Sequence, residues 1–286
     1  MKRILFFETS IFTGATRVSR TIAKKIHGRF ETSFTVIENL NRPKTEIFEA
    51  IQREKPDILF SSFTTINPDI IEVGKEEGLV VIVRSDYNLK DISQEERVRV
   101  LETYPKADWI IAQTPEMKQE LLSYQVLRDC RIKVIENPLD KEDILQKAME
   151  PNPFPDNGNF HFLWVGRRDP IKDLPTLEKA FEIVHKNYPN TDLTLVSDDS
   201  NPYRWMKNAD CQIISSISEA SPNVLREALL LGTKVVSTDC SPTVRKLLSS
   251  DMITSIGDVK ALAYKMMLRV QNNDNCVNNF YKDERN

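Results

Sequence analysis

Two glutamates lie eight positions apart in the segment SEASPNVLREALLLG, residues 218–232. Glu219 precedes a proline, and Glu227 falls inside the helix that is predicted after that proline. A carboxylate accepts two hydrogen bonds at once, which suits a pair of neighbouring sugar hydroxyls. Because 42 of the 286 residues are acidic, a second acid at any given spacing also arises by chance. The pair alone therefore leaves both interpretations open.

The start of this helix is suited to binding an anion. Ser221 is a favoured N-cap residue, and Pro222 is a favoured first residue of a helix. With this start, the amides of Asn223 and Val224 point towards an incoming anion, and the helix dipole adds a favourable field. We expect an anionic ligand at this position.

A second loop, LWVGRRDPIKDLP at residues 163–175, carries cations. A predicted strand ends before Gly166, Arg167 and Arg168 follow at once, and Lys172 lies five positions after Arg167. An arginine fork and a lysine point charge can grip different oxygens of a diphosphate. A solvated basic turn contains the same residue types, so this loop alone also leaves two interpretations open.

A third loop, within residues 8–20, is a weaker candidate because Gly14 is its one glycine. The GxGxxG dinucleotide fingerprint and the Walker lysine motif are absent, which argues against dehydrogenase chemistry. No Asp-x-Asp triplet occurs anywhere in the chain, so a common metal–diphosphate signature is absent as well.

The elements that must position these loops alternate between strands and helices, which predicts an α/β fold with parallel sheets. In the first half, the predicted strands are residues 3–7, 33–37, 57–61, 79–84, 109–112 and 132–135. A proline-rich linker follows at 150–159, and further strands are predicted at 160–165, 192–197, 211–215 and 233–237. We therefore predict two doubly wound domains, residues 1–152 and 153–286.

Composition excludes several other classes. A net charge of −3 argues against a nucleic-acid partner, and the apolar runs have strand length and fall far short of a membrane span. The four cysteines and three histidines are far apart in the sequence. The clustered ligands or side chains that a zinc, thiol-redox or Ser/His hydrolytic site requires are therefore missing. The N-terminus lacks a signal-peptide pattern, so we expect a cytoplasmic protein.

Taken together, the segments resemble the retaining glycosyltransferases of family 4. The stretch at 162–181 is similar to that family's strand, Gly-Arg, five-residue step to Lys and helix, and 209–239 is similar to its E-x7-E segment. Residues 134–140 are similar to the turn that closes its N-terminal domain. The resemblance implies the GT-B fold, with two Rossmann-like doubly wound parallel-sheet domains facing a central cleft.

The resemblance also implies roles for individual residues. Arg167 and Lys172 would bind the donor diphosphate, helped by Gly14, and Glu227 would bind the ribose. Glu219 would face the transferred sugar near its reacting carbon. The backbone amides implied to contact sugar and phosphate belong to Ala220, Ser221, Asn223 and Val224.

The implied reaction is transfer of a hexose-type sugar from a nucleoside diphosphate sugar, with retained anomeric configuration, to a glycan or glycolipid acceptor. The nucleotide sugar is a co-substrate, and neither a cofactor nor a metal is expected. Two alternatives remain: a nucleotide-sugar epimerase on the same fold, and a non-catalytic nucleotide-sugar-binding partner subunit.

Three departures from the family pattern bear on these alternatives. Ala220 replaces the usual Gly after the first Glu, which makes the loop less pliable. Residues 84–88, RSDYN, lack the His that many members place near the acceptor sugar, so Asp86 is our candidate for that catalytic position. The connection within 193–214 leaves hardly any room for a further β-α-β unit.

One helix suggests a membrane partner. Residues 17–29 contain five cations and no acid, with Arg17, Arg20 and Lys24 on one predicted face. The opposite face carries Val18, Ile22 and Ile26. Such a helix fits either a solvated outer face or peripheral contact with anionic lipid at the cytoplasmic membrane face.

Overall fold

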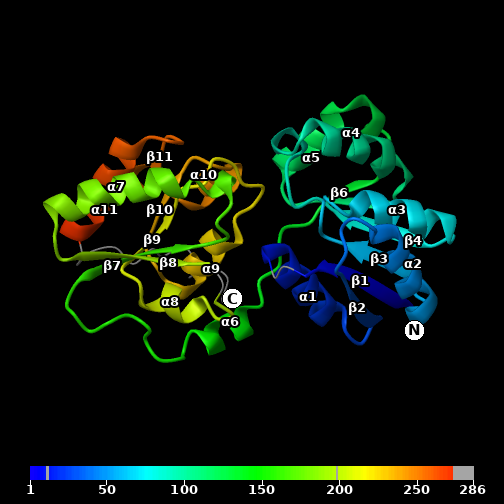
Figure 1. The fold of residues 1–286 in the computed structure, drawn as a ribbon, viewed down its shortest axis with the longest axis horizontal. Helices are drawn as coiled ribbons and strands as arrows, with labels where there is room; N and C mark the ends of the chain where they lie inside the picture. Colours follow the sequence, from blue (N-terminus) through cyan, green and yellow to red (C-terminus); the bar gives the residue numbers. More distant parts are fainter. Residues whose placement is uncertain (11–12, 198, 273–286) are drawn as a thin grey trace, which may run out of the picture. The chain divides into compact units, whose positions relative to one another are not determined.

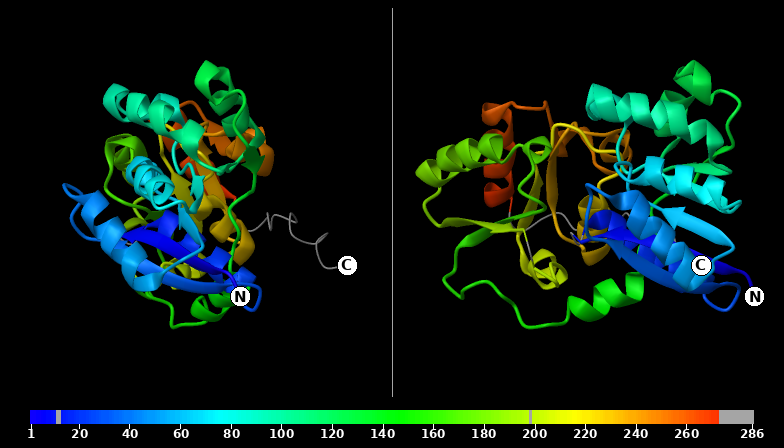
Figure 2. Two further views of the ribbon diagram at one scale, coloured as in Figure 1. Left: turned by 90° about the vertical axis from the view of Figure 1, so that its right-hand side faces the viewer. Right: turned by 45° about the vertical axis from the view of Figure 1, so that its right-hand side comes forward.

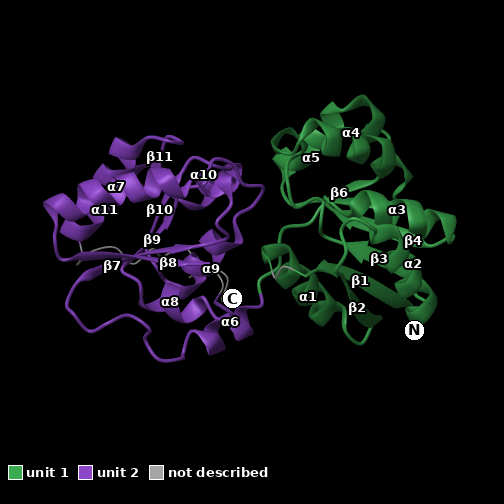
Figure 3. Ribbon diagram, viewed as in Figure 1, with its two compact units in different colours: residues 1–139 green, residues 140–286 purple. Residues whose placement is uncertain are grey.

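The computed structural model describes residues 1–10, 13–197 and 199–272. The chain divides into two compact units, Met1–Leu139 and Asp140–Asn286 (Figure 3). The predicted boundary at 152/153 falls inside the second unit, after its first helix, α6 (Lys141–Lys147). Each unit contains its own parallel sheet (Figure 1).

Unit 1 alternates strands and helices along the chain. Its elements are β1 (Arg3–Thr9), α1 (Gly14–Ile26), β2 (Glu31–Ile37), α2 (Pro43–Glu54), β3 (Ile58–Ser61), α3 (Asn67–Glu76), β4 (Val80–Arg84), α4 (Gln94–Thr103), β5 (Trp109–Ala112), α5 (Pro115–Ser123) and β6 (Ile132–Val134), with 3-10 turns η1 (Leu89–Asp91), η2 (Tyr104–Lys106) and η3 (Gln125–Leu127). The six strands pair in the order β2-β1-β3-β4-β5-β6.

Helix α1 packs on one face of this sheet. Ile4 and Phe6 alternate along β1 and meet Ala23 of α1, while the Phe6 ring stacks on Phe34 of β2 at 5.1 Å. Val18 of α1 is buried, as its predicted apolar face requires. The amphipathic pattern of this helix therefore reflects packing against its own sheet.

Unit 2 repeats the alternation. After α6 come β7 (Phe160–Val165), η4 (Pro170–Lys172), α7 (Leu174–Asn187), β8 (Thr191–Val196), α8 (Tyr203–Asn208), β9 (Cys211–Ile214), α9 (Asn223–Leu231), β10 (Val235–Thr238), α10 (Pro242–Leu247), η5 (Ser250–Met252), β11 (Ile253–Thr254) and α11 (Val259–Gln271). Its five strands are ordered β11-β10-β9-β7-β8.

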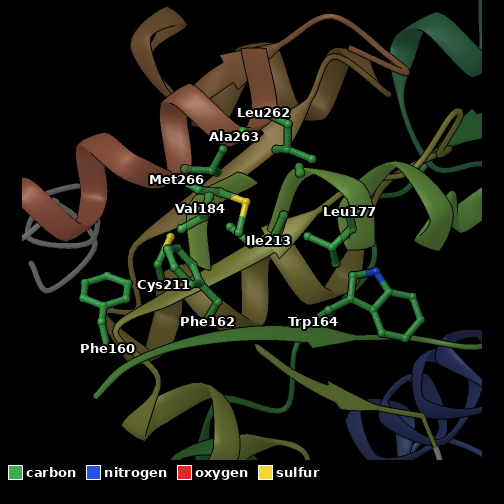
Figure 4. Close-up of a cluster of buried hydrophobic side chains, with 12 residues drawn as sticks. Phe160, Phe162, Trp164, Leu177, Val184, Cys211, Ile213, Leu262, Ala263 and Met266 are labelled. Carbon is green, nitrogen blue, oxygen red and sulfur yellow. The ribbon is translucent and has the colours of Figure 1, made fainter. Parts of the chain in front are cut away.

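Helices cover both faces of the second sheet. On one face, alternate β7 residues Phe160, Phe162 and Trp164 pack against α7 and α11 (Figure 4). These two helices lie side by side in the right-hand view of Figure 2. Leu225 of α9 and Val244 of α10 cover the other face. Unit 2 is therefore doubly wound, as predicted.

The strand order sets a switch point in each unit. In unit 2 the chain runs from β7 to β8 on one side and then returns to β9 on the other side of β7. Unit 1 has the same arrangement at β1 and β3. In open α/β sheets, ligands bind at the carboxyl ends of the strands beside such a switch. For unit 2 this position is the edge where β7 and β9 end.

Most predicted strands agree with the structure to within two residues, and β7 occupies the predicted residues 160–165. Strand β11 was not predicted. The short connection from β8 to β9 holds the six-residue helix α8. Cys130, Cys211 and Cys240 are free thiols, and Cys276 lies outside the described residues.

Candidate donor site in unit 2

The cationic loop begins where β7 ends. The Gly166 amide donates to the Val196 carbonyl of the neighbouring strand at 3.0 Å. A Cβ atom at Gly166 would lie 3.2 and 3.3 Å from two ring carbons of Trp164, which is buried in the core. A larger residue at this position would therefore push the Trp164 ring by a few tenths of an ångström, and glycine avoids this contact.

Arg167 and the turn that follows are fixed by local polar contacts. The Arg167 guanidinium lies 3.7 Å from the Asp169 carboxylate. Asp169 also caps η4, because its side chain accepts a hydrogen bond from the Ile171 amide at 3.1 Å. Asp173 then adopts a left-handed conformation, with φ of +46°, and caps α7. Asp tolerates this conformation better than most residues, so the chain turns directly from η4 into α7.

A second loop, between β9 and α9, is hydrogen-bonded to the first. The Ile217 amide donates to the Ile171 carbonyl at 2.8 Å. The Ser215 hydroxyl donates to the Lys172 carbonyl at 2.7 Å. Both bonds join segments far apart in sequence, because β7 and β9 are neighbours in the sheet. The two loops therefore form one edge at the switch point.

Lys172 and Glu219 form an ion pair at this edge. Ser216 donates to the same glutamate oxygen at 2.8 Å, and the Glu219 amide donates to the Cys240 carbonyl at 2.9 Å. Burial, with a smaller contribution from the Glu219 charge, raises the pKa of the Cys240 thiol to about 12. This thiol therefore stays protonated at neutral pH.

Helix α9 begins one residue later than predicted. Pro222 takes the N-cap position, without a side-chain cap, so the prediction of Ser221 as N-cap is wrong. Asn223 and Val224 are the first two helical residues, and the first amides of a helix point out of its N-terminal end. Ala220, two residues before the N-cap, is buried.

Glu227 lies inside α9 and is 3% exposed. The Tyr203 hydroxyl, at the start of α8, donates to its Oε1 at 3.5 Å. The Tyr203 amide donates to the Asn201 side chain at 3.1 Å, and the Asn201 side chain donates to the Lys147 carbonyl of α6 at 2.9 Å. The short β8–α8 connection is thus tied to α6 and brings a tyrosine to the predicted ribose ligand.

In unit 1, Gly14 is the first residue of α1 rather than part of the loop before it, which corrects its predicted placement. Thr13 is the N-cap and forms a capping box with Thr16, because each side chain accepts from the other residue's amide. The helix therefore begins without needing a flexible glycine.

Asp86, also in unit 1, follows β4. Its carboxylate accepts hydrogen bonds from the amide and the hydroxyl of Thr64 at 2.9 and 2.6 Å. Burial raises the pKa of Asp86, although these bonds and the nearby Arg84 charge oppose the shift. Burial also lowers the pKa of Arg84 to about 10, and its guanidinium donates to Asn137. Arg84 and Asp86 are therefore two desolvated, oppositely charged side chains at the carboxyl end of the central strand β4.

The structure joins some predicted residues and leaves others with different partners. Lys172 and Glu219 meet directly, whereas Arg167 pairs with Asp169. Sequence reasoning missed Ser215, Ser216 and Tyr203 as contributors to this edge. The signal for the two serines was their position at the end of the predicted strand 211–215, with Ser215 as its last residue and Ser216 directly after it.

On α1, Arg20 does not project freely from the predicted cationic face. It forms two hydrogen bonds with the buried Glu8 carboxylate, at 3.1 and 2.9 Å. Across residues 1–10, 13–197 and 199–272, no helix combines the length and apolar character needed to cross a membrane. Within the same ranges, no three His, Cys, Asp or Glu side chains gather as metal ligands would.

Part of the chain matches a known family. The family described as glycosyl transferases group 1 matches residues 137–272. An uncharacterized glycosyltransferase of Methanocaldococcus jannaschii is 28% identical over 180 residues, which are 52% of this chain and 44% of the relative.

A second curated relative is the N-acetylgalactosamine-N,N'-diacetylbacillosaminyl-diphospho-undecaprenol 4-alpha-N-acetylgalactosaminyltransferase of Campylobacter jejuni. It is 26% identical over 170 residues, which are 52% of this chain and 46% of the relative. The matches span less than half the length of either relative.

Solved structures show the same fold over nearly the whole chain. The Anabaena protein HepE, in complex with UDP and glucose, has a TM-score of 0.72 at 16% identity, covering 95% of this chain and 90% of that one. The trehalose-6-phosphate synthase OtsA has a TM-score of 0.74 at 10% identity, covering 95% and 92%. The predicted GT-B fold, with two Rossmann-like parallel-sheet domains, is confirmed. The sequence similarity to glycosyltransferases therefore lies in residues 137–272 and in about half of the chain for each curated relative, and the solved structures add the fold.

Proposed function

We propose that this protein is a retaining glycosyltransferase that moves a hexose-type sugar from a nucleoside diphosphate sugar to a glycan or lipid-linked acceptor. The observation that carries the proposal is the meeting of two loops at the switch point of unit 2. There, Lys172 from one loop pairs with Glu219 from the other. The family match over residues 137–272 covers both loops.

The leaving diphosphate needs stabilisation as the sugar bond breaks. We assign Lys172 and Arg167 to the diphosphate, because both lie after β7 at the edge where ligands bind such sheets. The first amides of α9 add donors and a helix dipole on the other side of the switch point. Fixed charges of this kind act on the charge that develops in the transition state. We propose that no metal is needed for this step.

The remaining assignments concern the nucleoside and the sugars. The buried Glu227 suits two ribose hydroxyls, and Tyr203 helps to orient its carboxylate. Glu219 is assigned to the transferred sugar. In unit 1, Gly14 is assigned to the phosphates, and Asp86 is assigned to the catalytic position on the acceptor side.

The relatives suggest which substrates to test first. HepE has been solved with UDP-glucose, so UDP-sugars are the first donors. The Campylobacter relative is named for a diphospho-undecaprenol acceptor, so polyprenyl diphosphate glycans are the first acceptors. We propose a cytoplasmic location, with peripheral contact between anionic lipid and the cations of residues 17–29 bringing the enzyme to such an acceptor.

The test is a transfer assay on the purified chain with a panel of nucleotide sugars, glycans and polyprenyl diphosphate glycans. Mass spectrometry should detect an acceptor that has gained one sugar, and NMR of its anomeric proton should show the configuration of the donor. Activity should persist in EDTA. An inverted product would refute retention, and loss of activity in EDTA that added metal restores would refute metal independence.

A second candidate is a nucleotide-sugar-binding subunit without turnover. It is favoured by Ala220, which stands where a more flexible glycine is expected and is buried, and by the single helix α8 between β8 and β9. Calorimetric binding of a nucleotide sugar, without transfer to any acceptor, would support this candidate. Acceptor-dependent release of nucleoside diphosphate by the purified chain would exclude it.

A further inference from the structure

The contact between Lys172 and Glu219 is well shielded for an ion pair. Their side chains are 19% and 16% exposed, so solvent and salt screen the attraction less than at an open surface. The Ser216 hydroxyl also donates a hydrogen bond to the same carboxylate oxygen, at 2.8 Å. The Glu219 carboxylate is therefore held by an ammonium and a hydroxyl. Hydrogen bonds to charged groups are stronger than neutral ones, so these two donors hold the side chain firmly.

The backbone beneath the pair is fixed on both sides. The Lys172 carbonyl accepts from Ser215 at 2.7 Å, and the Glu219 amide donates to the Cys240 carbonyl at 2.9 Å. The Ile217 amide adds a bond to the Ile171 carbonyl at 2.8 Å. Because these bonds hold both loops, Lys172 and Glu219 would separate by rotation of their side chains. Either charge can then take a new partner while the backbone stays in place.

This pair has a direct consequence for an incoming anion. The Lys172 ammonium already has a carboxylate partner, so a diphosphate does not meet a free cation. When the diphosphate takes the ammonium, the Glu219 carboxylate loses its strongest donor. A largely shielded carboxylate that loses a donor raises the free energy of the site unless another donor replaces it.

We propose that Glu219 is the resident counter-ion of Lys172, and that it lets the site distinguish an intact nucleotide sugar from the nucleoside diphosphate product. This inference rests on the proposed function. An intact donor supplies an anion to Lys172 and sugar hydroxyls to Glu219, so both charges keep a partner. The product supplies only the anion, which leaves Glu219 without a replacement donor. Product affinity is therefore held down and release is favoured.

The test is calorimetry with nucleoside diphosphates and nucleotide sugars that share a base, beginning with UDP and UDP-glucose and extending to the GDP and ADP series. Glu219→Gln keeps the shape of the side chain but removes its charge. We expect this variant to bind the nucleoside diphosphate about tenfold more tightly than wild type, because the competing charge is gone. The intact nucleotide sugar should gain less, so the preference for donor over product should shrink.

Two controls separate this mechanism from a general change in charge or stability. Glu178→Gln removes the same charge from an exposed position on α7 and should leave both affinities unchanged. In a Lys172→Met background, Glu219→Gln should no longer tighten product binding, because the cation for which it competes is absent. Glu219→Asp, which weakens the pair by shortening the side chain, should shift product affinity in the same direction by a smaller factor.

The outcomes are distinct. If wild type binds a nucleoside diphosphate but Glu219→Gln and Glu219→Asp bind it equally or more weakly, the counter-ion proposal is wrong while the donor site stands. If the tightening persists in the Lys172→Met background, Glu219 does not act through Lys172, which also overturns the proposal. If neither wild type nor Glu219→Gln binds any member of the panel, the proposed function fails and this inference fails with it.

Discussion

Replacing Gly166 by alanine should damage both the core and the cationic loop of unit 2. The new Cβ would lie 3.2 and 3.3 Å from the Trp164 ring, whereas carbon atoms prefer about 3.5–4.0 Å. Trp164 is 2% exposed and packs between β7 and its covering helices, so the ring has little room to move. Overpacking of this kind costs about 1–3 kcal/mol. We expect a loss of that size in the free energy of unfolding.

Urea denaturation measures the stability loss, and the KM for the nucleotide sugar reports displacement of Arg167 and its loop. Trp164→Phe offers a matched rescue because the smaller ring leaves space for the new methyl group. The double variant should lose less free energy of unfolding than the sum of the losses of the two single variants, by at least about 0.5 kcal/mol. Strict additivity, or an unchanged stability and KM for Gly166→Ala, would refute the steric account of this glycine.

Three further predictions follow from contacts in both units. Gly74→Ala should lower the free energy of unfolding by about 1–3 kcal/mol in urea, because its Cβ would lie 2.7 Å from Leu59; an unchanged value would show that the site is loosely packed. Burial raises the pKa of Asp86 in the folded protein, so its stabilising contribution is present at low pH and is lost as pH rises through that pKa. Asp86→Asn should therefore raise the Tm at pH 7, and this gain should vanish below about pH 4; a gain that does not depend on pH would contradict the linkage. Tyr203→Phe removes a hydrogen bond to Glu227 and should raise the donor KM several-fold while kcat changes less; equal loss in both would point to a different role.

Much of the fold is readable from the sequence because strands of parallel sheets are buried on both faces and appear as short apolar runs. The run at β7 predicts its strand without error. Strand β11 contains only Ile253 and Thr254, which is too short for any periodic pattern. The predicted start of α9 was one residue too early. Ser221 was a plausible N-cap and Pro222 a plausible first helical residue, and only the backbone conformation shows that Pro222 is the N-cap.

The candidate site was predicted in its parts but not in its connections. Spacing and the family resemblance identify Lys172 and Glu219 as candidates. Their ion pair depends on β7 and β9 being neighbours, which follows from strand order and not from any local pattern. Tyr203 was missed for a similar reason. Its contact with Glu227 depends on the packing of α8 against α9, which no local sequence pattern shows.

Acceptor-dependent sugar transfer by wild type and the Lys172→Ala variant tests the central claim most directly. If the switch point of unit 2 holds the donor diphosphate, wild type should transfer sugar, and loss of one stabilising cation should lower kcat/KM by about 100-fold or more. Glu178→Ala, at an exposed position on α7, should match wild type. Full transfer activity in Lys172→Ala would contradict the assignment of this edge as the donor site.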